Sequence, residues 1–217
     1  MKTRLLLISG WAHGTHTLQP MADRLAPLFD IQLLTGADAL NHPTLPETDA
    51  ILTGSMGGLL ALQRPPSSCQ KIMLLSGTAC FCKRPNYPHG TPERILQRMR
   101  HQLDKDPHTL LDTFHQNVHA PQKPSRQKKD APHPDLSALH AGLEYLQHTD
   151  LRPQIPSFPL PVLILHGTHD HIIPLQAAQW LHEQLPTSEL IPFNGLGHAL
   201  PAHAFERVMQ AAEHFLV

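Results

Sequence analysis

Short apolar runs alternate with longer amphipathic stretches along most of the chain. The apolar runs predict six buried strands, over residues 4–8, 30–34, 49–53, 71–76, 161–166 and 189–193. Helical spacing of apolar residues predicts helices over 18–28, 175–185 and from Phe205 to the last turn of the chain. This alternation indicates an α/β protein with a mostly parallel sheet and helices on both faces.

One region interrupts the alternation after the fourth predicted strand. Residues 80–155 hold three helical patterns, over 92–103, 107–118 and 135–147, and a Pro-, Lys- and Arg-rich stretch that predicts an exposed loop. Ligands of parallel sheets bind at the carboxyl ends of the strands, where such an insertion emerges. We therefore expect one domain over residues 1–217, with residues 80–155 as an inserted helical lid.

Composition excludes several classes of protein. The 217 residues are 41% hydrophobic and 16% charged, with a formal net charge of -1 at pH 7, so no overall field favours nucleic acid or anionic membrane. The apolar runs are far shorter than the roughly 20 residues of a membrane-spanning helix. Cys69, Cys80 and Cys82 are odd in number and poorly spaced for a disulfide, which indicates reduced thiols. We expect a cytoplasmic monomer.

A candidate nucleophile follows the third predicted strand. Residues 49–60 give a strand, a tight turn and an apolar helix, with Ser55 at the apex. A nucleophile elbow strains the backbone of its Ser and needs small residues two positions to either side. Gly57 satisfies this downstream, but Thr53 stands where Gly is usual, and its branched side chain is expected to widen or tilt the turn.

A catalytic Ser needs a base, and the base needs an acid that orients it. In a hydrolase with a nucleophile elbow the chain order is Ser, acid, His. Asp170 comes just after the fifth predicted strand, and His198 lies between small residues after the sixth. We expect His198 to be the general base and Asp170 the acid, although Asp170 could instead only cap the next helix.

Acyl transfer also needs N–H donors for the oxyanion. One donor is expected from the backbone of Met56, which follows the nucleophile and opens a helix. The other is expected from Trp11, in the loop after the first strand, with its indole along the acyl pocket; the alternative is an aromatic residue at the rim of the core. No metal or cofactor is expected.

Several stretches in chain order resemble the pimeloyl-acyl-carrier-protein (pimeloyl-ACP) methyl ester carboxylesterases of biotin synthesis, which are lidded α/β-hydrolases. The matching stretches are Gly10-Trp11, Gly54-Ser55-Met56-Gly57-Gly58-Leu59, residues 76–81, Gly142-Leu143-Glu144-Tyr145-Leu146, Thr149-Asp150-Leu151-Arg152, Asp170 with Pro174, and Gly197-His198-Ala199. The run from Gly142 to Arg152 lies outside the general catalytic motifs, and it favours this family over other α/β-hydrolases.

The resemblance implies hydrolysis of the methyl ester of pimeloyl-ACP to pimeloyl-ACP and methanol. It also implies an acyl site lined by a lid-helix stretch that begins with Phe and corresponds here to Phe114, His115, Gln116, Asn117 and Val118. Basic lid residues of the family receive the acidic carrier protein. Lys123, Arg126, Lys128 and Lys129 could do so here by salt-sensitive contacts, or could form an ordinary solvated loop.

The sequence departs from the family in three places. Ser9 replaces the His that commonly precedes Gly10. The first predicted strand begins at residue 4, so we expect the family's usual leading hairpin to be missing. Residues 35–48, with their two prolines, leave little room for a crossover helix. We expect a trimmed fold with one sheet edge exposed.

Other functions stay open at this level. A general short-acyl esterase or a thioesterase would use the same triad, and a non-catalytic binding protein would explain Thr53. Residues 166–171 also resemble the His-rich motif of metallo-β-lactamase-type hydrolases, but the middle His is shifted by one position and would point the wrong way on a strand end.

Overall fold

The computed structural model describes residues 2–124 and 134–217, and it is built on a six-stranded sheet of order β2-β1-β3-β4-β5-β6 with parallel pairing throughout. The strands are β1 (Thr3–Ile8), β2 (Phe29–Leu34), β3 (Ala50–Gly54), β4 (Lys71–Leu75), β5 (Val162–Gly167) and β6 (Ser188–Phe193). All six predicted strands are confirmed, each end within one residue of its predicted position.

Side chains that alternate along the strands form two hydrophobic cores, one on each face of the sheet. One core includes Ile51 and Ile164 and packs against α2 (Gly36–Asn41), α3 (Met56–Gln63) and α7 (Leu175–Gln184). The other includes Leu52 and Leu165 and packs against α1 (Gln19–Leu25) and α9 (Phe205–Leu216). Helices therefore cover both faces, as predicted. None of the helices described is both long and apolar enough to cross a membrane.

The short helix α2 corrects one sequence prediction. Residues 35–48 were expected to leave little room for a crossover helix, yet α2 forms at the start of this segment, ahead of both prolines. Thr35 caps it: its hydroxyl accepts the N–H of Asp38 at 3.0 Å, and the Asp38 carboxylate accepts the N–H of Thr35 at 3.3 Å. This reciprocal capping box supports a helix of six residues that would be marginal without it.

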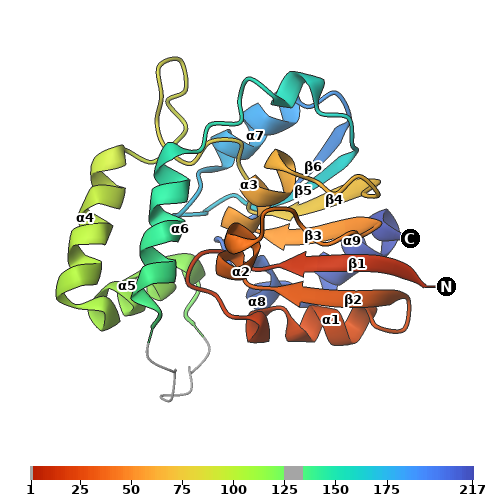
Figure 1. Ribbon diagram of the computed structural model, residues 1–217, viewed down its shortest axis with the longest axis horizontal. Coiled ribbons are helices and arrows are strands. Elements are labelled where there is room, and N and C mark those ends of the chain that lie inside the picture. Colours follow the sequence, from red (N-terminus) through yellow and green to blue (C-terminus); the bar gives the residue numbers. More distant parts are fainter. Residues whose placement is uncertain (1, 125–133) are drawn as a thin grey trace.

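Three helices form the segment between β4 and β5, here called the helical insertion: α4 (Glu93–Lys105), α5 (Pro107–His119) and α6 (Leu136–His148). They lie beyond the carboxyl ends of β1, β2 and β3 (Figure 1). The two ends of the helical insertion lie side by side, because the N–H of Leu151 donates to the carbonyl of Ala79 at 2.9 Å. The chain thus leaves the sheet and returns to it at one place, next to the strand ends. The remaining short elements are α8 (Leu200–His203) and two single 3-10 turns, Thr15–Thr17 and Ile155–Ser157.

Arg152 anchors the base of the insertion. Its guanidinium pairs with Asp150 at 2.6 Å, donates to the carbonyl of Pro85 at 3.1 Å, and lies 5.2 Å from the ring centre of Tyr87. The Tyr87 side chain is buried, and its hydroxyl bonds Thr78 at 3.1 Å. The Thr149-Asp150-Leu151-Arg152 run therefore holds the return of the chain against the loop that leads into α4.

Candidate active site

Ser55 sits at a strained turn between β3 and α3. Its backbone has φ 54° and ψ -119°, a region that costs a residue other than Gly about 1–3 kcal/mol. The turn is held from both sides, since the N–H of Ser55 donates to the carbonyl of Leu75 at 3.0 Å and its carbonyl accepts the N–H of Gly58 at 2.9 Å. This is the backbone that a nucleophile elbow requires.

Thr53 is accommodated by two features of its surroundings. β3 keeps its pairing on both sides at this residue, with Ile8 and with Leu74, so the branched side chain does not break the sheet. Its hydroxyl donates to the carbonyl of Ile8 at 3.0 Å. A Cβ on Gly57 would lie 2.2 Å from that hydroxyl, so the oxygen of Thr53 fills the space that the missing side chain leaves.

Asp170 is buried in the loop after β5 and faces His198. One carboxylate oxygen accepts the N–H groups of Ile172 and Ile173 at 2.8 and 2.9 Å, and the other lies 2.7 Å from Nδ1 of His198. Burial alone would raise the pKa of Asp170, but the nearby His198 and these hydrogen bonds outweigh it, so the pKa lies below its ordinary value. Asp170 does not cap α7, whose N-cap is Pro174.

The loop that carries His198 is held by β4 and by the end of α5. The carbonyl of His198 accepts the hydroxyl of Ser76 at 3.1 Å, and the N–H of Ala199 donates to the carbonyl of Val118 at 3.1 Å. A Cβ on Gly197 would lie 1.8 Å from the carbonyl oxygen of Ala120, so only Gly fits there. In the part of the chain described, no hydrogen bond joins His198 to Ser55; in unliganded sites this contact is often long and shortens when substrate binds.

The loop after β1 lies directly against the Ser55 side chain. A Cβ on Gly10 would lie 3.1 Å from Cβ and 3.6 Å from Oγ of Ser55. Within the described ranges, the backbone N–H groups of Trp11 and Met56 have no hydrogen-bond acceptor. Two N–H groups on the loops that flank Ser55 are thus available to an oxyanion.

Ser9 and His13 fix the shape of this loop. The Ser9 hydroxyl donates to the carbonyl of His13 at 2.6 Å and accepts the N–H of Gly36 at 3.2 Å, which ties the loop to α2. Nδ1 of His13 lies 2.7 Å from the carbonyl of Trp11. Loss of hydration lowers the pKa of His13 to about 4, so this ring is neutral at pH 7.

Trp11 joins the loop to the helical insertion. Its side chain is 3% exposed, its indole N–H donates to the carbonyl of Leu139 at 2.9 Å, and its ring meets Phe114 edge to face at 4.8 Å between centroids. A Cβ on Gly142 would lie 2.5 Å from the indole. Gly142 therefore lets α6 pack directly on Trp11, which gives a physical reason for Gly at the start of the Gly-Leu-Glu run.

The α5 residues named by resemblance divide into two groups. Phe114 and His115 are half-buried and lie near His13, at 6.0 and 5.6 Å between ring centroids, and Val118 is buried. Gln116 and Asn117 are exposed, so the structure does not bring them to Trp11. Of the basic residues, Lys123 is exposed, whereas Arg126, Lys128 and Lys129 lie outside the described residues.

The His-rich run that begins at the end of β5 does not form one cluster. His166 has no exposed surface, while His169 and His171 are exposed. Over residues 2–124 and 134–217, no three His, Cys, Asp or Glu side chains lie close enough together to hold a metal ion. The arrangement that the metallo-hydrolase reading requires is therefore not formed by these residues.

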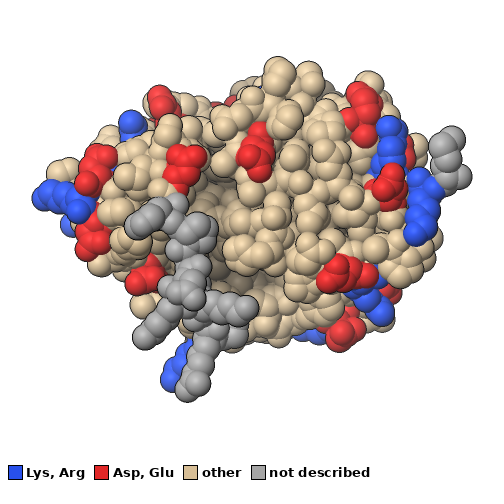
Figure 2. Space-filling model, turned by 60° about the horizontal axis from the view of Figure 1, so that its bottom comes forward, with Lys and Arg blue, Asp and Glu red and all other residues tan. Residues whose placement is uncertain are grey.

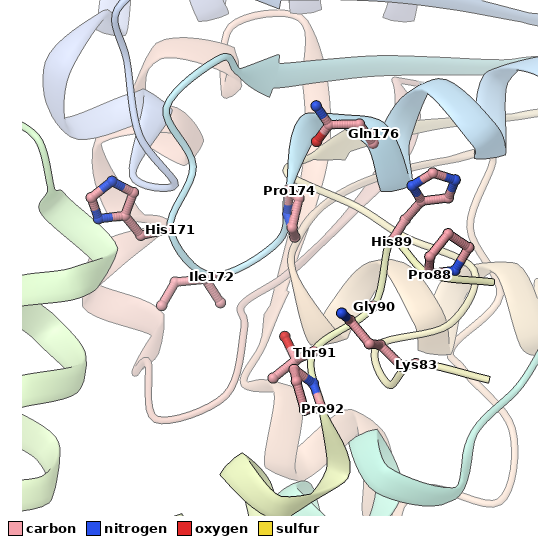
Figure 3. Close-up of a pocket in the computed structure, with 10 residues that line it drawn as sticks. All are labelled: Lys83, Pro88, His89, Gly90, Thr91, Pro92, His171, Ile172, Pro174 and Gln176. Carbon is pink, nitrogen blue, oxygen red and sulfur yellow. The ribbon is translucent and has the colours of Figure 1, made fainter.

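A pocket of about 370 Å³ adjoins the Asp170 loop on the surface (Figure 3). It is lined by the 83–92 loop, by the start of α7, and by His171 and Ile172, with His171 at one end, away from His89 and Gln176 (Figure 3). Ser55 and His198 do not line this pocket, so it is separate from the place where an ester would react.

Sequence reasoning missed three histidines that lie near the site. His13 holds the loop after β1 through the carbonyl of Trp11, and Nδ1 of His119 on α5 lies 2.9 Å from Nε2 of His203 on α8. No motif marks these residues among the 18 histidines of the chain, because their roles depend on packing between segments distant in sequence.

The chain is similar in sequence to a protein-family model and to named esterases. The family model Hydrolase_4, described as serine aminopeptidase, S33, matches residues 28–203. A pimeloyl-[acyl-carrier protein] methyl ester esterase of Aromatoleum aromaticum is 32% identical over 228 residues, which cover 90% of this chain and 90% of that protein. The protein of the same name from Nitrosomonas europaea is 28% identical over 224 residues, covering 90% of this chain and 88% of that protein.

Solved structures share the fold at lower identity. An esterase from Exiguobacterium antarcticum superimposes with a TM-score of 0.80 at 19% identity, covering 99% of this chain and 92% of that one. A bromoperoxidase from Bacillus anthracis superimposes with a TM-score of 0.82 at 17% identity, covering 100% and 92%. With the family match, these likenesses confirm the predicted α/β-hydrolase fold.

Proposed function

This chain belongs to the serine-hydrolase family described as serine aminopeptidase, S33, and from that premise we propose that it is a serine carboxylesterase of biotin synthesis. Its substrate is the methyl ester of pimeloyl-ACP, and its products are pimeloyl-ACP and methanol. The carrying observation is the buried Asp170–His198 contact of 2.7 Å beside a strained Ser55, in a chain that is 32% identical to a pimeloyl-[acyl-carrier protein] methyl ester esterase.

Acylation follows from these positions. The Asp170 carboxylate accepts a hydrogen bond from Nδ1 of His198, which leaves Nε2 unprotonated and able to take the proton of the Ser55 hydroxyl. Oγ of Ser55 then bonds to the carbonyl carbon of the ester. When the tetrahedral intermediate collapses, the proton on His198 passes to the methoxy oxygen, and methanol leaves.

Deacylation repeats the sequence with water. His198 takes a proton from water, the hydroxide oxygen bonds to the acyl carbon, and the proton passes to Oγ of Ser55 as the acid is released. In both tetrahedral intermediates the negatively charged oxygen accepts hydrogen bonds from the backbone N–H groups of Met56 and Trp11. Loss of one such donor costs about 3–4 kcal/mol in other serine hydrolases.

Substrate access is part of the proposal. The molecular surface is hollowed between the helical insertion and the sheet, and most of the visible surface around this hollow is uncharged (Figure 2). Residues 80–155 act as the lid, and Phe114, His115 and Val118 line the acyl chain together with Trp11. The exposed Lys123 and the basic residues after it receive the carrier protein.

The remaining proposals concern the setting. The three cysteines are free and buried, as suits a reducing compartment, and we place the enzyme in the cytoplasm. We also propose a monomer, because only Leu28, Ile95, Leu136 and Val217 are large hydrophobic residues with exposed side chains in the described structure, and they do not lie in one element.

The test compares three substrates on the same enzyme. Release of methanol from pimeloyl-ACP methyl ester is measured beside hydrolysis of a short p-nitrophenyl ester and of a short acyl thioester. We expect the highest kcat/KM for the carrier-bound methyl ester. A higher kcat/KM for the small ester would favour a general short-acyl esterase, and a higher value for the thioester would favour a thioesterase.

A further inference from the structure

His166, near the end of β5, is a fully buried polar side chain in an otherwise apolar strand. The strand reads Val-Leu-Ile-Leu-His-Gly, and all six of its residues are buried. His166 has no exposed surface. The mechanism above does not use it, yet its ring reaches the acid of the triad.

Two oxygen acceptors lie close to Nε2 of this ring. Nε2 of His166 lies 2.8 Å from the carbonyl oxygen of Ile173 and 3.4 Å from Oδ2 of Asp170. Neither oxygen carries a hydrogen, so Nε2 must hold the proton. The other nitrogen, Nδ1, is buried and has no hydrogen-bond partner in the described structure.

The ring is neutral in its surroundings. Burial lowers the pKa of His166, although Asp170 and the carbonyl of Ile173 act in the opposite direction, and the nearby His198 lowers it further. A neutral ring with its proton on Nε2 has a bare Nδ1, and the unpaired Nδ1 agrees with this state.

His166 and Ile173 together hold the carboxylate of Asp170. Oδ1 of Asp170 accepts the N–H of Ile173 at 2.9 Å, while His166 binds the carbonyl of the same residue. Both polar groups of Ile173 are thereby fixed. Oδ2 of Asp170 then lies between His166 at 3.4 Å and Nδ1 of His198 at 2.7 Å, so the carboxylate is held in one orientation.

Resting on the proposed function, we propose that His166 is a positioning residue that acts through Asp170. Its neutral ring donates from Nε2 to the carbonyl of Ile173 and packs against Oδ2 of Asp170. These contacts hold the carboxylate in the orientation in which Oδ2 accepts the hydrogen bond from His198. A structural role alone explains the position less well. Burying an unpaired Nδ1 reduces stability, whereas an apolar side chain of similar size would pack without that loss.

A matched pair of substitutions separates the two roles. Gln and Met have similar length and flexibility, but only Gln keeps an N–H that can reach the carbonyl of Ile173. We expect His166→Met to lower kcat for the p-nitrophenyl ester by about 10- to 100-fold with KM nearly unchanged, as when other groups that orient a functional side chain are removed. His166→Gln should recover most of the loss. The control is His171→Gln, on an exposed residue of the loop that carries Asp170, and it should match the wild type.

The outcomes are distinguishable from failure of the proposed function. If the wild type hydrolyses no ester, or if Ser55→Ala stays active, the triad itself is wrong. If the wild type is active and the Met and Gln variants have equal kcat, His166 is only a core residue. A measurement on the wild type needs no variant: nitrogen-15 NMR should show His166 neutral with its proton on Nε2 at pH 7. A proton on Nδ1 would overturn the proposal.

Discussion

Gly142 lets α6 pack closely against Trp11 in the loop after β1. Ala in a helix is favoured over Gly by roughly 0.5–1 kcal/mol, but a Cβ at this position would lie 2.5 Å from Cδ1 and 3.1 Å from Nε1 of Trp11. Overpacking of a buried site typically costs about 1–3 kcal/mol, so the clash outweighs the gain in helix propensity. We expect Gly142→Ala to destabilise the protein in urea unfolding and to lower kcat/KM, because Trp11 must move.

The matched control for this change is Glu144→Ala, on an exposed residue of the same helix. It gains helix propensity without a clash, so its unfolding midpoint and its kcat/KM should stay close to those of the wild type. If Gly142→Ala were as stable and as active as this control, α6 would not be packed on Trp11 as the structure shows.

Sequence motifs predicted the positions of some site residues but not the contacts of others. The positions of Ser55, Asp170 and His198 follow from local turns and chain order, and the structure joins the last two at 2.7 Å; their catalytic roles stay proposals. The accommodation of Thr53 by Gly57 was not predictable, because it depends on a hydroxyl that donates to the carbonyl of Ile8 on the neighbouring strand β1. The role proposed for His166 likewise needs the three-dimensional position of its ring.

Among the elements, the strands and the helices of the insertion, which both have a regular apolar pattern, were predicted accurately. The apolar stripes of α4, α5 and α6 fixed their ends within about two residues, because each helix buries one face against the others. Helix α2 was missed because its signal is local: a capping box at Thr35 and Asp38, followed by prolines that looked prohibitive but lie after its end. The capping box therefore indicates a helix that the spacing of apolar residues does not reveal.

The connection between α5 and α6 carries the prediction about the carrier protein. Lys128→Glu with Lys129→Glu reverses two charges of the basic group that begins at the exposed Lys123. We expect a higher KM for the carrier-bound methyl ester, more so at low salt, because screening weakens contacts between exposed charges. Hydrolysis of the p-nitrophenyl ester should barely change, since the triad is untouched.

The two substrates separate the alternatives for this connection. Equal loss on both substrates would mean that these lysines support the fold of the insertion. No loss on either would leave the segment a solvated loop with no part in binding. Lys2→Glu, at the start of the chain and outside the insertion, is a control for a single charge reversal elsewhere on the protein and should leave both activities unchanged.

For the molecule as a whole, buried and partly buried histidines contribute to the dependence of stability on pH. Burial lowers the pKa of His13 to about 4 and also lowers the pKa values of His115, His119, His166 and His203. Between the unfolded value of about 6.5 and these lower folded values, the unfolded chain binds more protons. Stability therefore falls as pH decreases through this range, and the part due to His13 is fully lost only below about pH 4.

Thermal unfolding at a series of pH values checks this. We expect Tm to fall from pH 7 to pH 4.5 and His13→Gln to make the decrease less steep, while His148→Gln, on an exposed residue, should follow the wild type. The His119–His203 contact adds to the effect, because its 2.9 Å hydrogen bond needs one unprotonated nitrogen. A Tm that is constant or rises toward pH 4.5 would contradict this assignment of neutral histidines.

The central claim is that Ser55 is the nucleophile of an esterase, and covalent labelling measures it most directly. The protein is treated with a fluorophosphonate, its intact mass is recorded, and the modified peptide is sequenced by mass spectrometry. The account predicts a single adduct on Ser55 and complete loss of ester hydrolysis with it. Ser55→Ala should take no label and lose on the order of 10⁴–10⁶ in turnover while it keeps the Tm of a folded protein. A label on another residue, or a Ser55→Ala variant with near-normal turnover, would contradict the account.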